Sequence, residues 1–252
     1  MDPVKTHIAT SDETSITVRG LDLVNDLMGK HSFTAVTYFL LRGRMPTPSQ
    51  TTVLDACLVT LMEHGWTPTS IIARLAADSV PGQAQVGIAA GLLAIGDVFV
   101  GTMEGCGRIL AEGIGKPDPQ AYCREVVAAH RAERKALPGF GHPFHKPDDP
   151  RSPRLFAIAR QAGMQGNYIA LLQALSAELD RAAGRHLTIN ATGAIAALLL
   201  EIDLPPAVMR SIAVVSRSGG LAGHLAEEQQ THAARRIWQL AEEHIPYEEP
   251  KA

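Results

Sequence analysis

The chain has 252 residues, of which 46% are hydrophobic and 19% are charged, and its formal net charge is −3 at pH 7. This balance, without a strongly basic block, gives no indication of a nucleic-acid partner. Aromatic residues make up only 5%, while Ala and Leu are abundant, and this bias favours helices over sheets.

The cysteines, the N-terminal residues and the apolar stretches of the sequence indicate the compartment. Cys57, Cys106 and Cys123 are dispersed without metal-ligand spacing, a pattern typical of reduced thiols in the cytoplasm. Residues 1–10 have no apolar signal core. The most apolar stretch, residues 86–96, is shorter than the roughly 20 residues that a bilayer span needs. We therefore expect a soluble cytoplasmic protein without a membrane partner.

Helical spacing begins soon after the N-terminus. The first dozen residues read as a loose tail, residues 15–18 as a short strand, and residues 22–43 as a helix that stops at Gly43. Four later helix starts share one pattern, in which a small polar residue precedes a proline at the first helical position. These starts are Thr47-Pro48 (with Gln50 completing a capping box), Thr67-Pro68, Asp118-Pro119 and Ser152-Pro153.

Two segments, Val86–Ile95 and Gly193–Leu200, are apolar on all sides and contain Gly and Ala. Such segments predict buried central helices. Helices over residues 167–183, 206–215 and 231–243 complete an all-α bundle, and residues 247–252 read as a mobile tail.

The longest irregular stretch, residues 137–150, is crowded with Gly, Pro, His and Asp. Its glycines allow tight turns and its prolines stiffen the chain, so His142, Lys146 and the following Arg151 are presented from a rigid loop. A His can donate to a carbonyl oxygen or move a proton near neutral pH, and an Arg can hold a carboxylate through two hydrogen bonds. A loop of this kind inside a helical protein is often functional.

Two other interpretations of this loop are open. His142, His145, Asp148 and Asp149 offer metal-binding groups, but three residues between ligands suits a helix, and Pro143 disfavours one. We therefore predict no metal. The loop could also be a structural surface loop with a hydrogen-bonded His, and residue chemistry alone does not decide between that role and an active site.

The loop resembles the signature loop of the citrate synthase superfamily, through Pro-Gly-x-Gly-His at 138–142 and Asp-Pro-Arg at 149–151. Other matches to that family run in the same order along the chain. They are the opening segment over 15–46, Glu63-His64-Gly65, residues 89–96, Ile189-Asn190, and Arg217-x-Gly219-Gly220-Leu221-Ala222-x-His224 with Glu227-Glu228.

The resemblance implies an all-α citrate synthase fold. A large helical domain would comprise residues 1–98 and 203–252, a small helical domain would comprise residues 99–202, and the active site would lie in the cleft between them. It also implies a homodimer or higher homo-oligomer, with Val86–Ile95 at the interface.

The resemblance further implies two ligands, a coenzyme A thioester and a di- or tricarboxylate-like acid. His142 would act as acid or base at the hydroxyl or ketone oxygen of the acid, with His64 assisting and Thr192 in the position of the family's catalytic Asp. The implied acid-binding residues are Arg151, Arg217, Asn190, Arg74 and Phe99, and the implied coenzyme A-binding residues are Lys146 and Gly141.

Two positions depart from the family's pattern. Phe99 stands where citrate synthases carry a catalytic His, as in the similar citryl-CoA lyase module of ATP-citrate lyase, which favours the lyase branch. Thr192 stands where the family has its catalytic Asp. A Thr hydroxyl is a poor base at neutral pH, and loss of a general base typically costs about 10²–10⁴ in rate.

The leading hypothesis is that the protein makes or breaks a C–C bond next to a coenzyme A thioester. Because Thr192 replaces the carboxylate, two alternatives remain open. One is a divergent decarboxylase of coenzyme A esters, and the other is a non-catalytic homologue that binds coenzyme A or a carboxylate.

Overall fold

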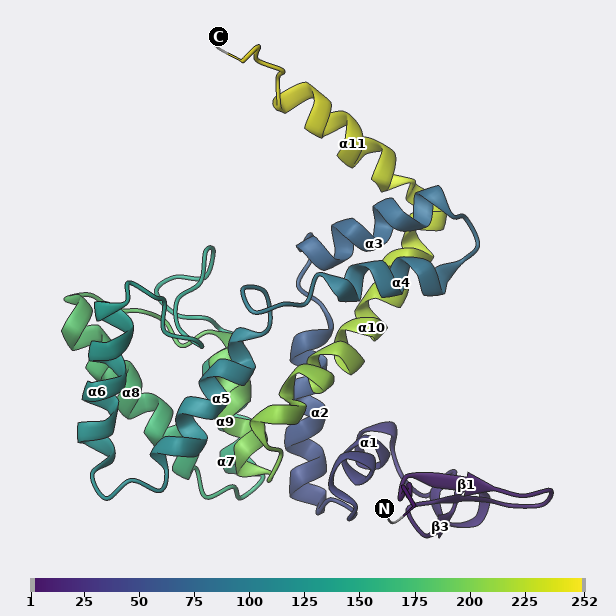
Figure 1. The fold of residues 1–252 in the computed structure, drawn as a ribbon, viewed down its shortest axis with the longest axis horizontal. Coiled ribbons are helices and arrows are strands. Elements are labelled where there is room, and N and C mark those ends of the chain that lie inside the picture. The colour runs from purple at the N-terminus through teal and green to yellow at the C-terminus, as the bar shows by residue number, and fades with distance from the viewer. Residues whose placement is uncertain (1–2, 251–252) are drawn as a thin grey trace.

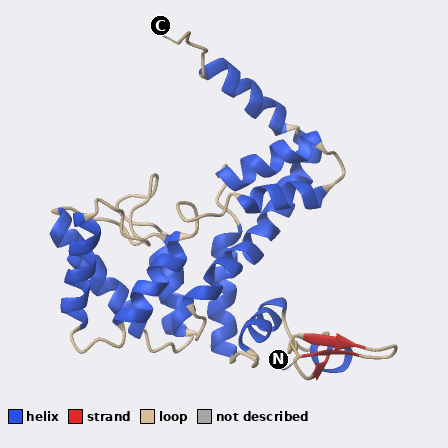
Figure 2. Cartoon of the chain, viewed as in Figure 1, coloured by secondary structure: helices blue, strands red, loops and turns tan. Residues whose placement is uncertain are grey.

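A small antiparallel sheet lies at one end of an otherwise helical molecule (Figure 2). The computed structural model describes residues 3–250. Strands β1 (Ala9–Ser11), β2 (Ile16–Val18) and β3 (Leu21–Asp22) pair in the order β1-β2-β3, with Ala9 opposite Val18. The strand predicted at 15–18 is confirmed. The prediction of a loose tail was wrong for residues 9–11, because they pair with β2.

The single helix expected over residues 22–43 is two elements. A short π-helix, η1 (Leu23–Leu27), is followed by α1 (Phe33–Arg42), whose N-terminus is capped by the Ser32 hydroxyl. α1 ends as predicted at Gly43, which adopts the left-handed conformation with φ 74°.

Ten further helices follow within residues 3–250, and three of the four predicted proline starts are confirmed. The exception is Ser152-Pro153, because the Ser152 hydroxyl donates to the Ile189 carbonyl (2.7 Å) instead of capping, and the helix begins at Arg151. The helices are α2 (Pro48–Met62), α3 (Pro68–Ser79), α4 (Ala84–Leu93), α5 (Thr102–Gly113), α6 (Pro119–Ala132), α7 (Arg151–Gln161), α8 (Asn167–Ala183), α9 (Ala191–Glu201), α10 (Pro206–Thr231) and α11 (Ala233–His244).

Helix α9 lies at the centre of the core, as predicted. Residues 194–199 are fully buried, and α9 packs against α2, α5, α7 and α8. The main hydrophobic cluster joins these helices to α10 and is continuous across both boundaries of the proposed small domain. The division into two domains therefore stays a prediction.

Helix α4 is not buried, so the corresponding prediction was wrong for this chain on its own. Only Gly87 and Gly91 of α4 are buried, and Leu93 is 86% exposed. The reason is one-sided packing: α4 contacts α3 and the C-terminal half of α10, and nothing in residues 3–250 covers its other side. With α11, these helices form an arm that projects from the bundle (Figure 1).

Helix α10 continues far beyond the predicted end at Val215 and runs unbroken for 26 residues. A Cβ at Gly220 would overlap the Met62 carbonyl oxygen, so the glycine allows α10 to touch the C-terminal end of α2. This contact places Arg217 beside the Glu63-His64 segment. No helix among the described residues has both the length and the apolar character that crossing a bilayer demands.

Candidate active site

A pocket of about 490 Å³ opens between the end of α2, the 137–150 loop, the starts of α5 and α9, and the middle of α10. This volume is typical of small-molecule sites. Eight of the ten predicted site residues line it, namely His64, Phe99, Gly141, His142, Arg151, Asn190, Thr192 and Arg217. Segments far apart in the sequence therefore meet at one site.

The 137–150 loop is tied to the start of α9 by backbone contacts. The backbone N–H of Asn190 donates to the Gly139 carbonyl (3.1 Å), and the side-chain Nδ2 of Asn190 donates to the Gly141 carbonyl (2.9 Å). A Cβ at Gly193 would overlap the Gly139 carbonyl oxygen, so only glycine permits this approach. Asn190 thus fixes the 137–150 loop, which carries His142, relative to Thr192.

His142 is held as a hydrogen-bond donor. Its Nδ1 accepts the backbone N–H groups of Phe144 (3.1 Å) and His145 (3.0 Å), so the neutral ring carries its proton on Nε2. Burial, assisted by the neighbouring His145, lowers the pKa of His142, which keeps the ring neutral near pH 7. His142 was predicted to act as an acid or as a base. This geometry favours a role as acid, in which the ring donates its Nε2–H.

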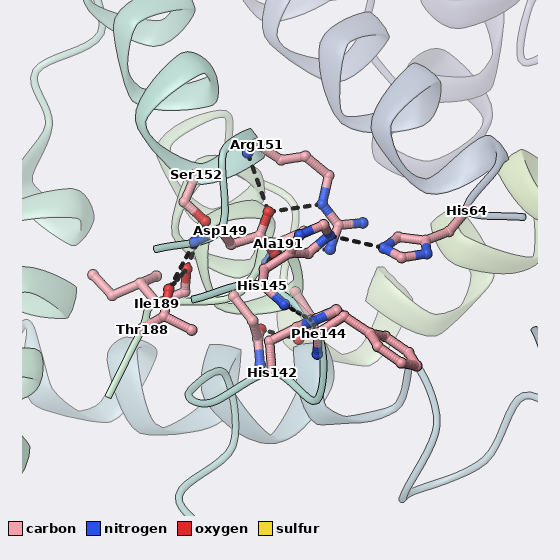
Figure 3. A network of polar contacts seen from close by, with 12 residues as sticks. His64, His142, Phe144, His145, Asp149, Arg151, Ser152, Thr188, Ile189 and Ala191 are labelled. Carbon is pink, nitrogen blue, oxygen red and sulfur yellow. Dashed lines mark hydrogen bonds and ion pairs between the residues drawn. The ribbon is translucent and has the colours of Figure 1, made fainter. Parts of the chain in front are cut away.

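Three histidines meet at the pocket, although the sequence did not single out His145 as a site residue (Figure 3). His64 Nε2 lies 3.2 Å from His145 Nε2, and the His145 ring lies over the His142 ring with centroids 4.3 Å apart. This contact joins the end of α2 to the 137–150 loop.

These three rings bring their nitrogens within 4.8 Å of one another, a spacing that a metal ion could use. The donor set fits a metal poorly, because Nδ1 of His142 is occupied and its Nε2 carries the proton. His64 and His145 are joined by one N–H···N hydrogen bond, so these two rings together keep one free lone pair. The aspartates of the metal hypothesis point elsewhere: Asp148 contacts His186 (3.0 Å) and Asp149 contacts Arg151 (2.8 Å).

Two guanidinium groups face the pocket. Arg217 is 5% exposed, its Nε and Nη1 have no hydrogen-bond partner, and the nearest carboxylate oxygen, on Glu63, is 4.0 Å away. Burial lowers the pKa of Arg217, with Arg151 adding repulsion, but an Arg remains charged. Among the described residues, no Asp or Glu lines this pocket. The charged side chains in the pocket wall are therefore cationic, and a guanidinium group suits a carboxylate.

The Thr192 hydroxyl is already engaged. It donates to Asn190 Oδ1 (2.7 Å) and lies 2.9 Å from the Thr102 hydroxyl, which therefore donates to it. A hydroxyl held in this way is no more basic than a free one. The geometry agrees with the expectation that Thr192 cannot replace the carboxylate as a base.

Two predicted residues lie outside the pocket wall. Arg74 is 1% exposed and bonds Glu228 (2.8 Å), Glu227 and His224, so its guanidinium is not presented to a substrate. It lies 4.8 Å from the ring of Trp66, a pocket residue, which it helps to place. Lys146 is exposed on the 137–150 loop.

Several pocket features were not foreseen from the sequence. Phe144 and Val98 line the pocket although 81% and 95% exposed, so they form an apolar rim at its mouth. The sequence signal for such a rim was a large apolar residue, Phe144, directly after the Gly-His-Pro run of the loop. Thr102 and Trp66 gave no comparable signal.

Comparison with known proteins gives consistent matches. Residues 46–240 match the family described as citrate synthase, C-terminal domain. The solved citryl-CoA lyase of Hydrogenobacter thermophilus is 30% identical, with a TM-score of 0.88 over 99% of this chain and 96% of that one. The ATP citrate lyase of Methanothrix soehngenii, solved with citrate and coenzyme A, gives a TM-score of 0.82 at 20% identity, over 100% of this chain and 43% of that one.

The citrate synthase of Acidithiobacillus ferridurans is 25% identical over 200 residues, or 75% of this chain. The chain spans only 50% of that protein's length, in contrast to its nearly complete coverage of the Hydrogenobacter lyase. These likenesses confirm the predicted all-α citrate synthase fold. The chain belongs to the citrate synthase/citryl-CoA lyase superfamily, on the side of the citryl-CoA lyases.

Proposed function

We propose that the protein cleaves or forms the C–C bond next to a coenzyme A thioester, with citryl-CoA as the model substrate and oxaloacetate and acetyl-CoA as its products. The observation that carries this proposal is the pair of cationic side chains, Arg151 and Arg217, in a pocket without a lining carboxylate and beside the N–H donor of His142. That set matches a polycarboxylate bearing a hydroxyl or ketone oxygen.

In the cleavage direction, the substrate hydroxyl loses its proton as the adjacent C–C bond breaks. The bond's electron pair moves onto the thioester fragment as an enolate, and the hydroxyl oxygen becomes a ketone oxygen. The Nε2–H of His142 stabilises the negative charge that develops on this oxygen. Arg151 and Arg217 hold the carboxylates and fix the orientation of the bond that breaks.

The thioester would enter past the apolar rim of Phe144 and Val98. Lys146, exposed on the same loop as Phe144, supplies a cation for a coenzyme A phosphate. Phe99 in the pocket wall offers no hydrogen bond to the thioester oxygen. The loop thus contributes both to the acid site and to the coenzyme A site.

The test is direct. Purified protein is incubated with citryl-CoA, and release of oxaloacetate is followed by its reduction with NADH and malate dehydrogenase. We expect turnover in the wild type and its loss in His142→Ala, with the fold unchanged by circular dichroism. Full activity in His142→Ala would contradict the role given to this residue.

A second candidate function follows from the engaged Thr192 and the missing carboxylate. Loss of CO₂ from a coenzyme A ester generates an enolate without a base, so a decarboxylase would need no group in that position. Release of CO₂ from a malonyl-type thioester, with no cleavage of citryl-CoA, would favour this reaction. If coenzyme A or a carboxylate stabilises the protein but neither reaction occurs, the protein is a non-catalytic binding protein.

We further propose that a second copy of the chain covers the exposed side of α4. Leu93 is 86% exposed there, and Val86 on the same helix is also exposed. Apolar side chains seven residues apart lie on the same face of a helix, and exposed apolar surface of this kind marks an interaction face. Light scattering should give the mass of a dimer or a multiple of it, and Leu93→Glu should shift the protein toward the monomer.

A further inference from the structure

Either direction of the proposed reaction needs a group that takes a proton and gives it back. We propose that His64 is this catalytic group and that His145 is its positioning residue, the two acting as a hydrogen-bonded pair. This inference rests on the proposed function and assigns a proton carrier where Thr192 supplies none.

The other side chains around the pocket are poor proton acceptors. The Thr192 and Thr102 hydroxyls bond each other, and His142 Nδ1 is filled by two backbone N–H groups. Two carboxylates contact pocket-lining residues and both are engaged: Asp149 accepts from Arg151 and from the Ala191 N–H, and Glu63 accepts from the backbone N–H groups of His64 (2.8 Å) and Gly65 (2.6 Å).

Glu63 is also a weak base. Burial raises the pKa of Glu63, but the His224 ring and those backbone N–H groups outweigh it and hold the pKa below its usual value. Among the described residues that line the pocket, His64 is therefore the one side chain left with a ring nitrogen able to accept a proton.

The contact between the two rings engages Nε2 of His64, so the nitrogen of His64 that is left for a substrate is Nδ1. The Nε2 atoms of His64 and His145 are 3.2 Å apart, so one of them donates its proton to the other. When His64 donates, its Nδ1 holds the free lone pair. A neutral His145 ring can accept or donate in this contact, and the proposed pair assigns it the acceptor role, which leaves His64 Nδ1 basic.

The position of His145 is well defined. Its backbone N–H donates to His142 Nδ1 (3.0 Å), and its ring lies over the His142 ring (Figure 3). The same short segment therefore fixes both the donor at the ketone oxygen and the partner of the proposed base. After His64 takes a proton, the hydrogen bond to the neutral His145 ring stabilises the new cation, while Arg151 and Arg217 favour its rapid return.

The proton balance is simple in the cleavage direction. His64 Nδ1 takes the hydroxyl proton as the C–C bond breaks and its electron pair becomes the enolate. The cationic His64 then gives the same proton to the enolate carbon, which forms the methyl group of the thioester product. No proton, electron or further reactant enters or leaves.

Substitution of His145 tests the pair. Leu cannot accept a hydrogen bond from His64, whereas the carbonyl oxygen of Gln can. We expect His145→Leu to lower kcat for citryl-CoA by about 10²-fold or more with little change in KM, and His145→Gln to recover part of that loss. His130→Leu, on α6 outside the pocket, serves as the control. Wild-type kcat in His145→Leu, or equal losses in the Leu and Gln variants, would overturn the positioning role.

A second measurement is independent of turnover. In protein labelled with ¹⁵N at histidine, an N–H···N bond gives scalar coupling between the two Nε2 nuclei. We expect this coupling in the wild type and in His130→Leu, with His64 Nδ1 unprotonated. If the coupling is present and citryl-CoA is not cleaved, the pair stands and the proposed function fails. If citryl-CoA is cleaved and the coupling is absent, the pair is wrong and the function stands.

Discussion

Asp149 holds Arg151 through both of its carboxylate oxygens, with Nε to Oδ1 at 2.9 Å and Nη2 to Oδ2 at 2.8 Å. The same carboxylate accepts the backbone N–H of Ala191 at the start of α9 (3.0 Å), and its side chain is fully buried. One carboxylate therefore fixes the pocket residue Arg151 and joins α7 to α9.

We expect Asp149→Asn to lower the free energy of unfolding by about 1–3 kcal/mol near neutral pH, because charged hydrogen bonds are weakened in a buried site. Urea unfolding measures this change. Asp148→Asn, a change of the exposed neighbour, is the matched control and should stay within about 0.5 kcal/mol of the wild type. Equal stabilities of the two variants would contradict the structural role of Asp149.

The pH dependence of stability should change in the same variant. Burial raises the pKa of Asp149, but the hydrogen bonds and charge of Arg151 outweigh it, so the folded pKa lies below the ordinary value. The unfolded state then binds a proton first as the pH falls, and the stability that Asp149 provides is lost as the pH falls through the folded pKa. The difference between wild type and Asp149→Asn should therefore shrink toward acid pH.

Arg217→Met should separate binding from stability. The buried guanidinium lacks partners at Nε and Nη1, so an apolar side chain of similar length removes an uncompensated charge. We expect stability in the absence of ligand to be unchanged or higher, and the Kd for oxaloacetate to rise by about 10- to 100-fold. Calorimetry measures both. Arg210→Met, on the same helix but outside the pocket, should leave the Kd unchanged.

Thr192→Asp tests whether the pocket can use the carboxylate that it lacks. Position 192 lies in the first turn of α9, where the helix dipole favours a negative charge. We expect faster exchange of the methyl protons of acetyl-CoA with D₂O in the presence of oxaloacetate, by at least about tenfold. Thr192→Asn provides the uncharged control, and equal exchange in the Asp and Asn variants would count against this expectation.

Phe144→Ala should weaken binding of the thioester but not of the acid. Phe144 is 81% exposed at the pocket rim, and covering such a side chain contributes about 1.5–3 kcal/mol. We expect KM for citryl-CoA to rise by about tenfold or more, with the Kd for oxaloacetate unchanged. Phe33 on α1 is 74% exposed and lies outside the pocket, so Phe33→Ala is the control. An unchanged KM would remove Phe144 from the proposed entrance.

The sequence predicts elements well where local chemistry decides. The Thr47–Gln50 capping box forms with both hydrogen bonds, at 3.1 and 3.2 Å, because each partner lies within one helical turn. Prediction from the sequence fails where a tertiary contact overrides helix propensity. Gly219 and Gly220 lower the helix propensity of residues 216–230, yet α10 runs through them, because Gly220 must approach the Met62 carbonyl.

The candidate site also has features that local sequence predicts and features that depend on tertiary contacts. The Gly-His-Pro loop and Arg217 are recognisable as motifs, and the structure brings them together at one pocket. The contact between His64 and His145 spans 81 residues of sequence, so no local pattern announces it. Arg74 shows the opposite limit, since its motif position gave no sign that Glu227 and Glu228 would surround it.

The unbroken course of α10 limits how the pocket can respond to a ligand. A helix of 26 residues is about 39 Å long, and it carries Arg217 on the same rod as Leu221 and Leu225, which pack against the glycines of α4. These contacts hold α10, and with it Arg217, in a fixed position. Closure of the pocket around a ligand must then come from movement of the opposite wall, the segments that bear Val98 and Phe144.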